Sequence, residues 1–457
     1  MHNNKEFLGT ESIGRLLLKL ALPTVAAQLI NMLYNIIDRI YIGHMPVNGD
    51  MAFTGVGVCM PIIMIVAAFA ALISSGGAPR ASIFMGKKEL LSAEKTLGGC
   101  FMLQMIISFV LTAILCIWSK DLLYAFGASE NTIQYAYDYM KIYALGTVFV
   151  QLTLGMNAFI SAQGFTKTSM LSVLLGAVTN IALDPLFIYK FNMGVKGAAL
   201  ATIISQALSC AWILIFLTGK RTVIKLKPKY FFVSPRITLP CMALGSAMFI
   251  MQASESVIYI CFNSSLLKYG GDIAVGTMAI LTSVMQFAML PLQGIAQGAQ
   301  PILSYNCGAG NAERVKKTFR LLLISCLIYS IVLWTCVMIF PRTFAAIFTN
   351  DIPMLDYTEH VIRIYFGGMI IFGIQVACQM TFVSLGNALC SVIVAVVRKF
   401  VLLTPLIYIM PHIVNDAALG VYMAEPIADI IAVTFTTVLF AFQFKKMLKK
   451  IKAPSGT

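Results

Sequence analysis

Acidic side chains are rare inside the long apolar stretches of this chain, and the few that occur there are the first candidates for chemistry. They are Asp38, Asp184, Glu255, Glu425 and Asp429. An ionisable group near the centre of a bilayer costs roughly 2.5–3.5 kcal/mol on insertion scales, so each one that is retained needs a function or a partner. Burial disfavours the charged carboxylate, and a second acid nearby disfavours it further, so such a pair can take up a proton near neutral pH.

Two groups of polar residues share helical faces with the first two acids. Asn31 and Tyr34 lie seven and four residues before Asp38, and Asn180 lies four residues before Asp184. We expect these groups to form one cation-coupling pocket, which would bind H⁺, or Na⁺ at the two aspartates. The alternative is local pairing, for instance of Asp38 with the arginine that follows it. The expected members of the pocket are Tyr34, Asp38, Asn157, Asn180, Asp184 and Thr202.

The second half of the chain carries a different polar set. Glu425 and Asp429 are four residues apart, and Arg398 could pair with an acid and fix its own helix. Glutamines at helical spacing are expected to line a wet cavity, because unpaired amides that face lipid are costly. Glu255 is expected to contact substrate or proton, with a structural ion pair as the alternative. The expected second-lobe set is Gln252, Glu255, Gln286, Gln293 and Gln375.

The composition shows which elements must hold these residues. Of the 457 residues, 59% are apolar and only 11% are charged, and the mean hydropathy is +0.85. Soluble domains are about 45–50% apolar and about 25% charged, so this chain is an integral membrane protein. A spanning helix needs about 20 apolar residues, and the apolar content suffices for about a dozen. This excludes a soluble enzyme that carries a single anchor.

Charge and turn residues divide the apolar sequence into twelve expected spans, so the predicted fold class is all-α. The limits are 16–43, 51–77, 93–118, 133–160, 168–189, 196–219, 237–264, 272–300, 318–340, 356–383, 389–411 and 418–444. A basic segment that begins at Lys220 separates the first six spans from the last six. Its length and charge are typical of a cytoplasmic connection between two bundles.

An internal repeat supports this division. A constant offset of 222 residues pairs Gly76 with Gly298 and Gly86 with Gly308. Each copy holds six spans, so we expect two parallel six-helix bundles related by an axis along the membrane normal. The expected organisation is a cytoplasmic tail at 1–13, a first lobe at 14–220, a basic cytoplasmic linker at 221–235, a second lobe at 236–446 and a second cytoplasmic tail at 447–457.

The net charge of +14 comes from 33 Lys and Arg against 19 Asp and Glu. Basic clusters occur in every second connection, which is the pattern of cytoplasmic loops. Topology therefore explains the excess charge, and we expect no nucleic-acid partner. The predicted location is the cell membrane, with multiple spans, both termini cytoplasmic and some affinity for anionic lipid headgroups.

Several motifs, taken in order, resemble the multidrug and toxic compound extrusion family, in its bacterial and archaeal branch with an aspartate in the first span. They are Leu22-Pro23, the run from Leu33 to Asp38, the run from Asn180 to Pro185, the run from Gly197 to Thr202, Gln300-Pro301 and the run from Tyr305 to Asn311. The resemblance covers essentially the whole chain. It implies that the positions matching Asp38 and Asp184 belong to a cation site in the first lobe.

The resemblance also implies an activity. A member of this family would export lipophilic or cationic drugs in antiport with H⁺ or Na⁺ by alternating access, with two bundles around a central cavity. It would act as a monomer in the bilayer and need no cofactor besides the coupling ion. The alternative is a flippase for lipid-linked precursors, which shares the same superfamily architecture. Because GxxxxGK[ST], HExxH and GxSxG are all absent, we expect no enzyme.

Overall fold

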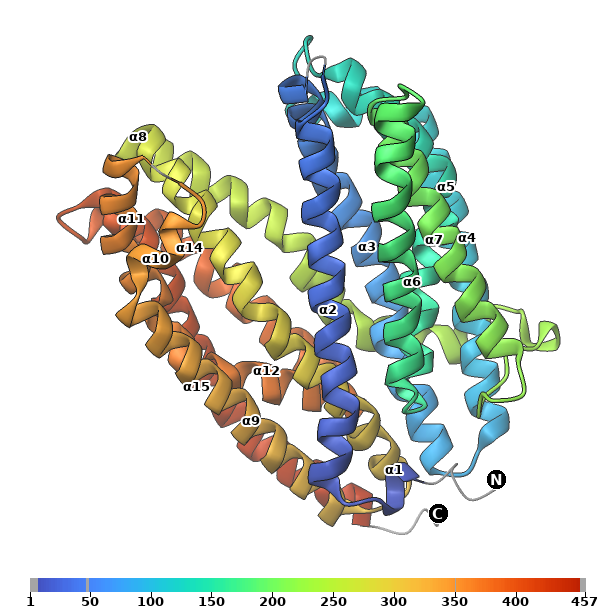
Figure 1. Cartoon of the computed structure of the whole chain (residues 1–457). Helices are drawn as coiled ribbons and strands as arrows, with labels where there is room; N and C mark the ends of the chain where they lie inside the picture. Colours follow the sequence, from blue (N-terminus) through green and yellow to red (C-terminus); the bar gives the residue numbers. More distant parts are fainter. Residues whose placement is uncertain (1–6, 47–48, 350, 453–457) are drawn as a thin grey trace.

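The computed structural model describes residues 7–46, 49–349 and 351–452, and within these ranges the secondary structure is helical, without strands (Figure 1). The expected tails at 1–13 and 447–457 therefore lie only partly within the described residues. The expected lobe and linker limits remain predictions. The all-α architecture itself is confirmed.

The first bundle follows the expected spans closely. Charged and turn residues end most of its helices within three residues of the predicted limits, but α3 and α4 continue nine and seven residues beyond the predicted ends of their spans. Its helices are α1 (Phe7–Thr10), α2 (Ile13–Gly43), α3 (Gly49–Gly86), α4 (Leu90–Ala125), α5 (Ile133–Ala162), α6 (Thr166–Pro185), the π-helix η1 (Leu186–Lys190) and α7 (Val195–Thr218).

The second bundle has more interruptions than the sequence indicates. Its elements are η2 (Pro228–Tyr230), α8 (Pro235–Gly308), α9 (Ala312–Ile339), α10 (Pro341–Ala346), α11 (Ile352–Tyr365), η3 (Phe366–Gly368), α12 (Met369–Ser384), α13 (Ala388–Val396), the π-helix η4 (Val397–Leu403), α14 (Thr404–Ile409), η5 (Met410–His412) and α15 (Ala417–Lys452). In the described ranges, eleven helical segments are long and apolar enough to cross a membrane.

Eleven segments hold twelve spans because α8, which has 74 residues, contains two of them. At about 1.5 Å per residue, a straight helix of this length would far exceed a bilayer of about 30 Å. Gly271 interrupts it with φ 67° and ψ −161°, a conformation that glycine adopts without steric cost. The seventh and eighth expected spans, 237–264 and 272–300, thus lie on either side of this glycine, and the twelve-span prediction is confirmed.

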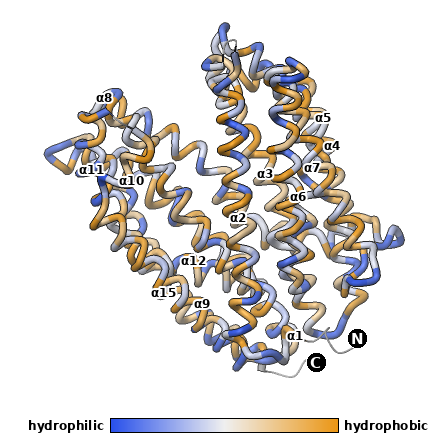
Figure 2. Tube along the Cα trace, in the orientation of Figure 1, coloured by the Kyte–Doolittle hydropathy of each residue, from blue (hydrophilic) through white to orange (hydrophobic). Residues whose placement is uncertain are grey.

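The two bundles meet at the end that carries the chain termini and diverge toward the opposite end (Figure 1). Apolar residues are distributed along the lengths of the helices, and hydrophilic residues concentrate at the ends and in the connections (Figure 2). This distribution is typical of helices that cross a hydrocarbon layer.

Paired glycines permit close contact where the bundles meet. A Cβ atom on Gly76 of α3 would overlap the carbonyl oxygen of Cys241 in α8, and one on Gly298 of α8 would lie 2.5 Å from the Cα atom of Ala21 in α2. Each of these glycines therefore packs against backbone of the other bundle. Gly76 and Gly298 are paired by the 222-residue repeat, so equivalent contacts between the bundles form at two places.

A second glycine pair joins α3 to α8 nearer the termini. A Cβ on Gly86 would overlap the carbonyl oxygen of Tyr305, and one on Gly308 would overlap that of Ile83. Small residues allow helix backbones to approach closely in membrane proteins, where association depends on packing. The repeated glycines thus mark the interface between the bundles.

The basic linker is held against the first bundle by two side chains. The Gln163 Oε1 atom accepts hydrogen bonds from the Thr222 hydroxyl at 2.8 Å, from the Val223 amide at 2.7 Å and from the amide of the next residue at 3.1 Å. Glu94 pairs with the Lys227 ammonium at 2.6 Å. This hydrogen bond raises the pKa of Lys227, so the lysine stays charged across the neutral range. The linker is thus an ordered part of the first lobe's surface.

The segment that precedes α2 packs against the second bundle. The Leu8 carbonyl accepts hydrogen bonds from Asn306 Nδ2 at 3.0 Å and from Arg314 Nη2 at 3.2 Å. The same Arg314 nitrogen donates to the Glu11 carbonyl at 2.8 Å, and Arg314 Nε donates to Asn306 Oδ1 at 3.0 Å. One guanidinium therefore ties the start of the chain to the other lobe.

Candidate functional site

Asp38 and Asp184 come together in the first bundle, where α2 packs against α6. These residues are 6% and 0% exposed, and their carboxyl groups are close enough to interact with each other electrostatically. Among the described residues, no ion pair joins Asp38 to Arg39, whose side chain is exposed. The dyad is therefore buried without a salt bridge to a basic side chain among the described residues.

Amide and hydroxyl groups complete this dyad. Asn180 Nδ2 donates to Asp184 Oδ1 at 3.3 Å and approaches the Thr202 hydroxyl at 3.5 Å. Three buried oxygen atoms face no donor among the described residues: Asp38 Oδ1, Asp184 Oδ2 and Asn180 Oδ1. Unsatisfied buried oxygens are costly, so this group of acceptors favours a bound proton or cation.

The structure places the two remaining expected members differently. Tyr34 lies one turn before Asp38 on α2, close enough to interact electrostatically with its carboxyl group. Asn157 on α5 instead bonds to α6, with Nδ2 donating to the Ser169 carbonyl at 3.4 Å and Oδ1 accepting from the Ser172 hydroxyl at 3.2 Å. Its hydrogen bonds thus hold the helices beside the dyad and do not reach the carboxyl groups.

Two tyrosines on α5 were not predicted. Tyr139 lies close to both the Asp38 carboxyl and the Thr202 hydroxyl, and Tyr143 lies near the Tyr34 hydroxyl. Their rings stack with centroids 6.3 Å apart, and both side chains are 3% exposed. The i, i+4 spacing of two hydroxyl-bearing residues in a predicted span is the signal that could have identified them.

Each bundle has a π-helix next to its ionisable residues. In the first, α6 ends at Pro185, directly after Asp184, and η1 follows. In the second, η4 contains Arg398 and Lys399 and is followed by Pro405 within α14. Proline removes a backbone donor, and π-turns often accompany functional sites. A π-turn contains one more residue than an α-helical turn, so it changes the direction of the side chains beside it.

A buried ion network occupies the second bundle. Arg398 donates from Nε to Asp429 Oδ1 at 2.8 Å and from Nη2 to Glu425 Oε1 at 3.2 Å, so it links η4 to α15. Its guanidinium also lies over the Phe372 ring, 4.5 Å from the centroid. The side chains of all three charged residues are less than 10% exposed. Arg398 thus pairs with both acids of the twelfth span.

Glu255 forms a separate pair at the edge of this network. Its Oε1 atom accepts from Lys399 Nζ at 2.7 Å. The lysine side chain is 5% exposed, whereas that of Glu255 is 56% exposed. The glutamate is therefore accessible from one side while the lysine holds it on the other.

The expected glutamines differ in their exposure. Gln252 is half-buried, Gln286 and Gln293 are exposed, and Gln375 is buried with its Oε1 atom facing no donor among the described residues. A further glutamine of α8, Gln297, accepts from Gln28 Nε2 of α2 at 3.1 Å and so joins the two bundles. The exposed members follow one stretch of α8.

The donor set at the dyad suits a proton or a small hard cation. Carboxylate, amide and hydroxyl oxygens are the ligands that hard cations prefer, and soft metals prefer thiolate or imidazole. No cluster of three or more His, Cys, Asp or Glu residues that could hold a metal occurs in residues 7–46, 49–349 and 351–452. The residues present therefore fit H⁺ or Na⁺ at Asp38 and Asp184.

Proteins with names that indicate export are similar to this chain along most of its length. Multidrug export protein MepA of Staphylococcus haemolyticus (strain JCSC1435) is 24% identical over 399 residues, which is 87% of each chain. The protein of the same name from Staphylococcus aureus (strain NCTC 8325 / PS 47) is 21% identical over 398 residues, again 87% of each chain. The chain is thus similar to proteins named for export along most of their length.

Solved structures have the same fold. A crystal structure of MATE in the bent conformation superposes with a TM-score of 0.92 at 21% identity, covering 98% of this chain and 99% of the other. An outward-facing multidrug resistance MATE family transporter of the MOP superfamily gives 0.90 at 20% identity, with 97% and 98% covered. The MatE family model matches twice, at residues 23–186 and 247–409. The chain therefore belongs to the multidrug and toxic compound extrusion (MATE) family.

Proposed function

We propose that this transporter exports lipophilic or cationic compounds in antiport with H⁺ or Na⁺, and that Asp38 and Asp184 bind the coupling ion. The buried dyad without a cationic partner is the observation that carries the proposal. The relatives named multidrug export protein support the substrate class. Members of the family move solutes and are not enzymes, so no covalent chemistry is required of these residues.

The dyad supplies a simple coupling mechanism. Two adjacent carboxylates repel each other, so a proton or Na⁺ that enters between them removes a large electrostatic cost. Asn180 and Thr202 offer further oxygen atoms, and Tyr139 closes the site on the α5 side. Ion binding therefore changes the charge of the first lobe, and a cationic substrate competes for the same negative charge.

The second lobe contributes polar contacts for the substrate. Glu255, Gln286 and Gln293 are exposed within the seventh and eighth spans. Carboxylates and amides that faced lipid at this depth would be costly, so we place them toward the space between the lobes. Gln252 lies one turn before Glu255, and Gln375 offers an unpaired oxygen.

The protein resides in the cell membrane as a multi-pass monomer. The basic connections lie at the end that carries both termini, which favours a cytoplasmic position for this end. The lobes diverge toward the opposite end, so the chain is in an outward-facing arrangement. Its partners are small-molecule drugs and the lipid bilayer.

Reconstituted protein tests the coupling. In proteoliposomes, wild-type protein is expected to move a cationic dye in response to a separately imposed H⁺ or Na⁺ gradient, and Asp184→Asn and Asp38→Asn are expected to abolish this response. Asp121→Asn is the matched control, because Asp121 is exposed at the end of α4. Dye flux that ignores both gradients in the wild type would contradict the proposed antiport.

A further inference from the structure

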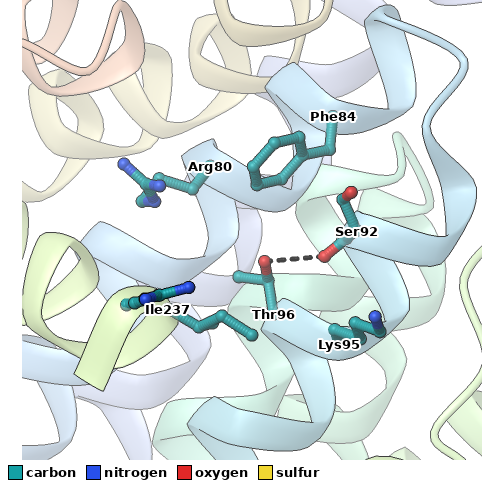
Figure 3. Close-up of a pocket in the computed structure, with 7 residues that line it drawn as sticks. Arg80, Phe84, Ser92, Lys95, Thr96 and Ile237 are labelled. Carbon is teal, nitrogen blue, oxygen red and sulfur yellow. Dashed lines mark hydrogen bonds between the residues drawn. The ribbon is translucent and has the colours of Figure 1, made fainter. Parts of the chain in front are cut away.

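A cavity of about 130 Å³ lies where α3 and α4 of the first lobe meet the start of α8. Figure 3 shows Arg80 and Phe84 on α3 opposite Ser92, Lys95 and Thr96 on α4. The linker enters α8 on the remaining side, where a third basic residue lines the cavity. The cavity is remote from the Asp38–Asp184 dyad and takes no part in the proposed coupling.

Cationic side chains dominate the walls of this cavity. Arg80, Lys95 and Arg236 line it, and no carboxylate is among the lining residues. No ion pair joins any of the three to an acid in the part of the chain that the structure describes. The neighbouring acid Glu94 is already bound to the linker, and Glu89 accepts a hydrogen bond from the Ser92 hydroxyl at 3.2 Å.

The internal repeat identifies the equivalent position in the second lobe, where an arginine side chain fills the space. At the offset of 222, Ser92 corresponds to Arg314 and Phe84 to Asn306. In the second lobe, the Arg314 guanidinium is bound by Asn306 Oδ1 and by the carbonyls of Leu8 and Glu11. The chain segment before α2 thus closes the equivalent place with an internal cation and internal acceptors.

The first lobe has different residue types at these positions. Serine replaces the arginine and leaves space, while Arg80 stands where the second lobe has the buried Ile302. The Lys95 position is basic in both copies, because its counterpart is Lys317. Arg80 lies over the Phe84 ring, 5.8 Å from the centroid, and it also interacts with the Cys241 thiol. The first-lobe cavity therefore has cations on its walls and no carboxylate among its lining residues, so an anion would complement it.

We propose that this cavity binds the phosphate group of an anionic phospholipid headgroup. Guanidinium groups bind phosphate oxygens through paired, charge-assisted hydrogen bonds, and basic pockets between membrane helices bind anionic headgroups. Arg80 lies less than two turns from the end of α3, at the level where the hydrocarbon layer gives way to headgroups. The orientation proposed above places the site in the cytoplasmic leaflet.

The bound phosphate connects both halves of the molecule. Arg80 and Lys95 belong to the first lobe, whereas Arg236 lies in the first turn of α8, which begins the second lobe. The ligand therefore stabilises the arrangement in which the start of α8 lies against α3 and α4. Anionic lipid is expected to increase thermal stability in this conformation.

The test measures binding of phosphatidylglycerol to the full-length protein in detergent micelles, by native mass spectrometry and by the lipid-dependent rise in Tm. Removing one cation, as in Arg80→Gln or Arg236→Gln, is expected to weaken binding about fivefold. Ser92→Leu fills the cavity while all three charges remain, and is also expected to lose binding. Lys317→Gln, at the exposed counterpart of Lys95, is the control that should bind normally.

Each outcome decides the proposal. Loss of binding in Arg80→Gln, Arg236→Gln and Ser92→Leu, with normal binding in Lys317→Gln, supports the cavity as the site. Equal binding by Ser92→Leu and wild type overturns it, because diffuse attraction to basic loops would then suffice. Phosphatidylcholine is expected to give no rise in Tm, and inorganic phosphate that protects as well as phosphatidylglycerol would overturn the lipid as the source. Circular dichroism confirms that each variant is folded.

Discussion

The buried acids of the two lobes differ in how their charge is balanced. Among the described residues, neither Asp38 nor Asp184 forms an ion pair with a basic side chain, whereas Glu425 and Asp429 share Arg398. A carboxylate that already has a cation bound gains little from a proton or Na⁺. We therefore expect the first-lobe dyad to remain available for ion exchange, and the second-lobe acids to hold η4 against α15 through Arg398.

The Tyr139 hydroxyl provides the first prediction. It lies near both Thr202 and Asp38, so Tyr139→Phe removes a polar contact from the proposed ion site while keeping the ring. A neutral hydrogen bond contributes about 1 kcal/mol, so gradient-driven dye transport is expected to fall about fivefold. Tyr137→Phe, two residues away on the same helix, is the control and should transport normally. Unchanged transport in Tyr139→Phe would place this hydroxyl outside the site.

Arg398 provides a prediction about stability. Arg398→Met leaves Glu425 and Asp429 buried without a cation, and breaking a buried ion network in this way costs about 3–5 kcal/mol. Thermal unfolding in detergent is expected to show a large fall in Tm. The triple variant with Glu425→Gln and Asp429→Asn should recover much of it. If the triple variant is no more stable than Arg398→Met, uncompensated charge is not the cause.

The sequence identified the residues of the proposed ion site more readily than their hydrogen-bond partners. Helical spacing identified Asp38, Asp184 and Asn180, because polar groups are conspicuous in apolar spans. It could not show that Asn157 would bond to serines of α6, since serines occur throughout the spans and carry no distinguishing signal. It also left Arg398 without a named partner, because pairing between distant helices depends on their packing.

At the scale of helices, the paired glycines give a prediction with an internal control. Gly76→Ala introduces a methyl group against the Cys241 carbonyl, which is expected to destabilise the contact between α3 and α8 by about 1–3 kcal/mol. Gly57 lies on the same helix with nothing within 4 Å of an added Cβ, so Gly57→Ala should be neutral or stabilising. Differential scanning fluorimetry of the two variants measures this. Equal Tm values would mean that the bundles separate without cost at this contact.

The helix limits were accessible from hydropathy, but the irregular turns were not. Charged residues and turn residues end apolar spans by a local rule, so the predicted limits lie close to the observed ones. The π-helices η1 and η4 each lie beside a proline and an ionisable residue. Prolines also occur inside the regular helices α2 and α3, so a proline in the sequence does not by itself predict an irregular turn.

At the scale of the whole molecule, the anchored linker predicts protease sensitivity. Gln163→Leu removes the acceptor for three donors of the linker, which carries trypsin sites such as Lys220, Arg221 and Lys225. Trypsin is expected to cut this variant faster than wild type in inside-out vesicles, and Gln134→Leu should behave like wild type. In right-side-out vesicles the linker of all three proteins should stay intact, although trypsin can cut at basic residues of the outer connections. Cleavage within the linker in these vesicles would contradict the proposed orientation.

The repeat allowed the architecture to be predicted, although its physical cause emerged only from the structure. Sequence offsets paired Gly76 with Gly298 without indicating what either residue touches. Contacts between the lobes join residues far apart in the chain, and no periodicity within one helix reports them. The same limit applied to the cavity at Arg80, whose significance depends on comparison with the packing around Arg314.

The glycine contacts also suggest how such a molecule can originate and be divided. Gly76 touches the seventh span and Gly298 touches the first, so the two halves contact each other through equivalent surfaces. This reciprocity is the rule for a twofold homodimer. A single six-helix polypeptide with these glycines would therefore self-associate in one parallel orientation, and a gene fusion would preserve the interface. By the same reasoning, two separately synthesised halves of the present protein should reassemble in the bilayer.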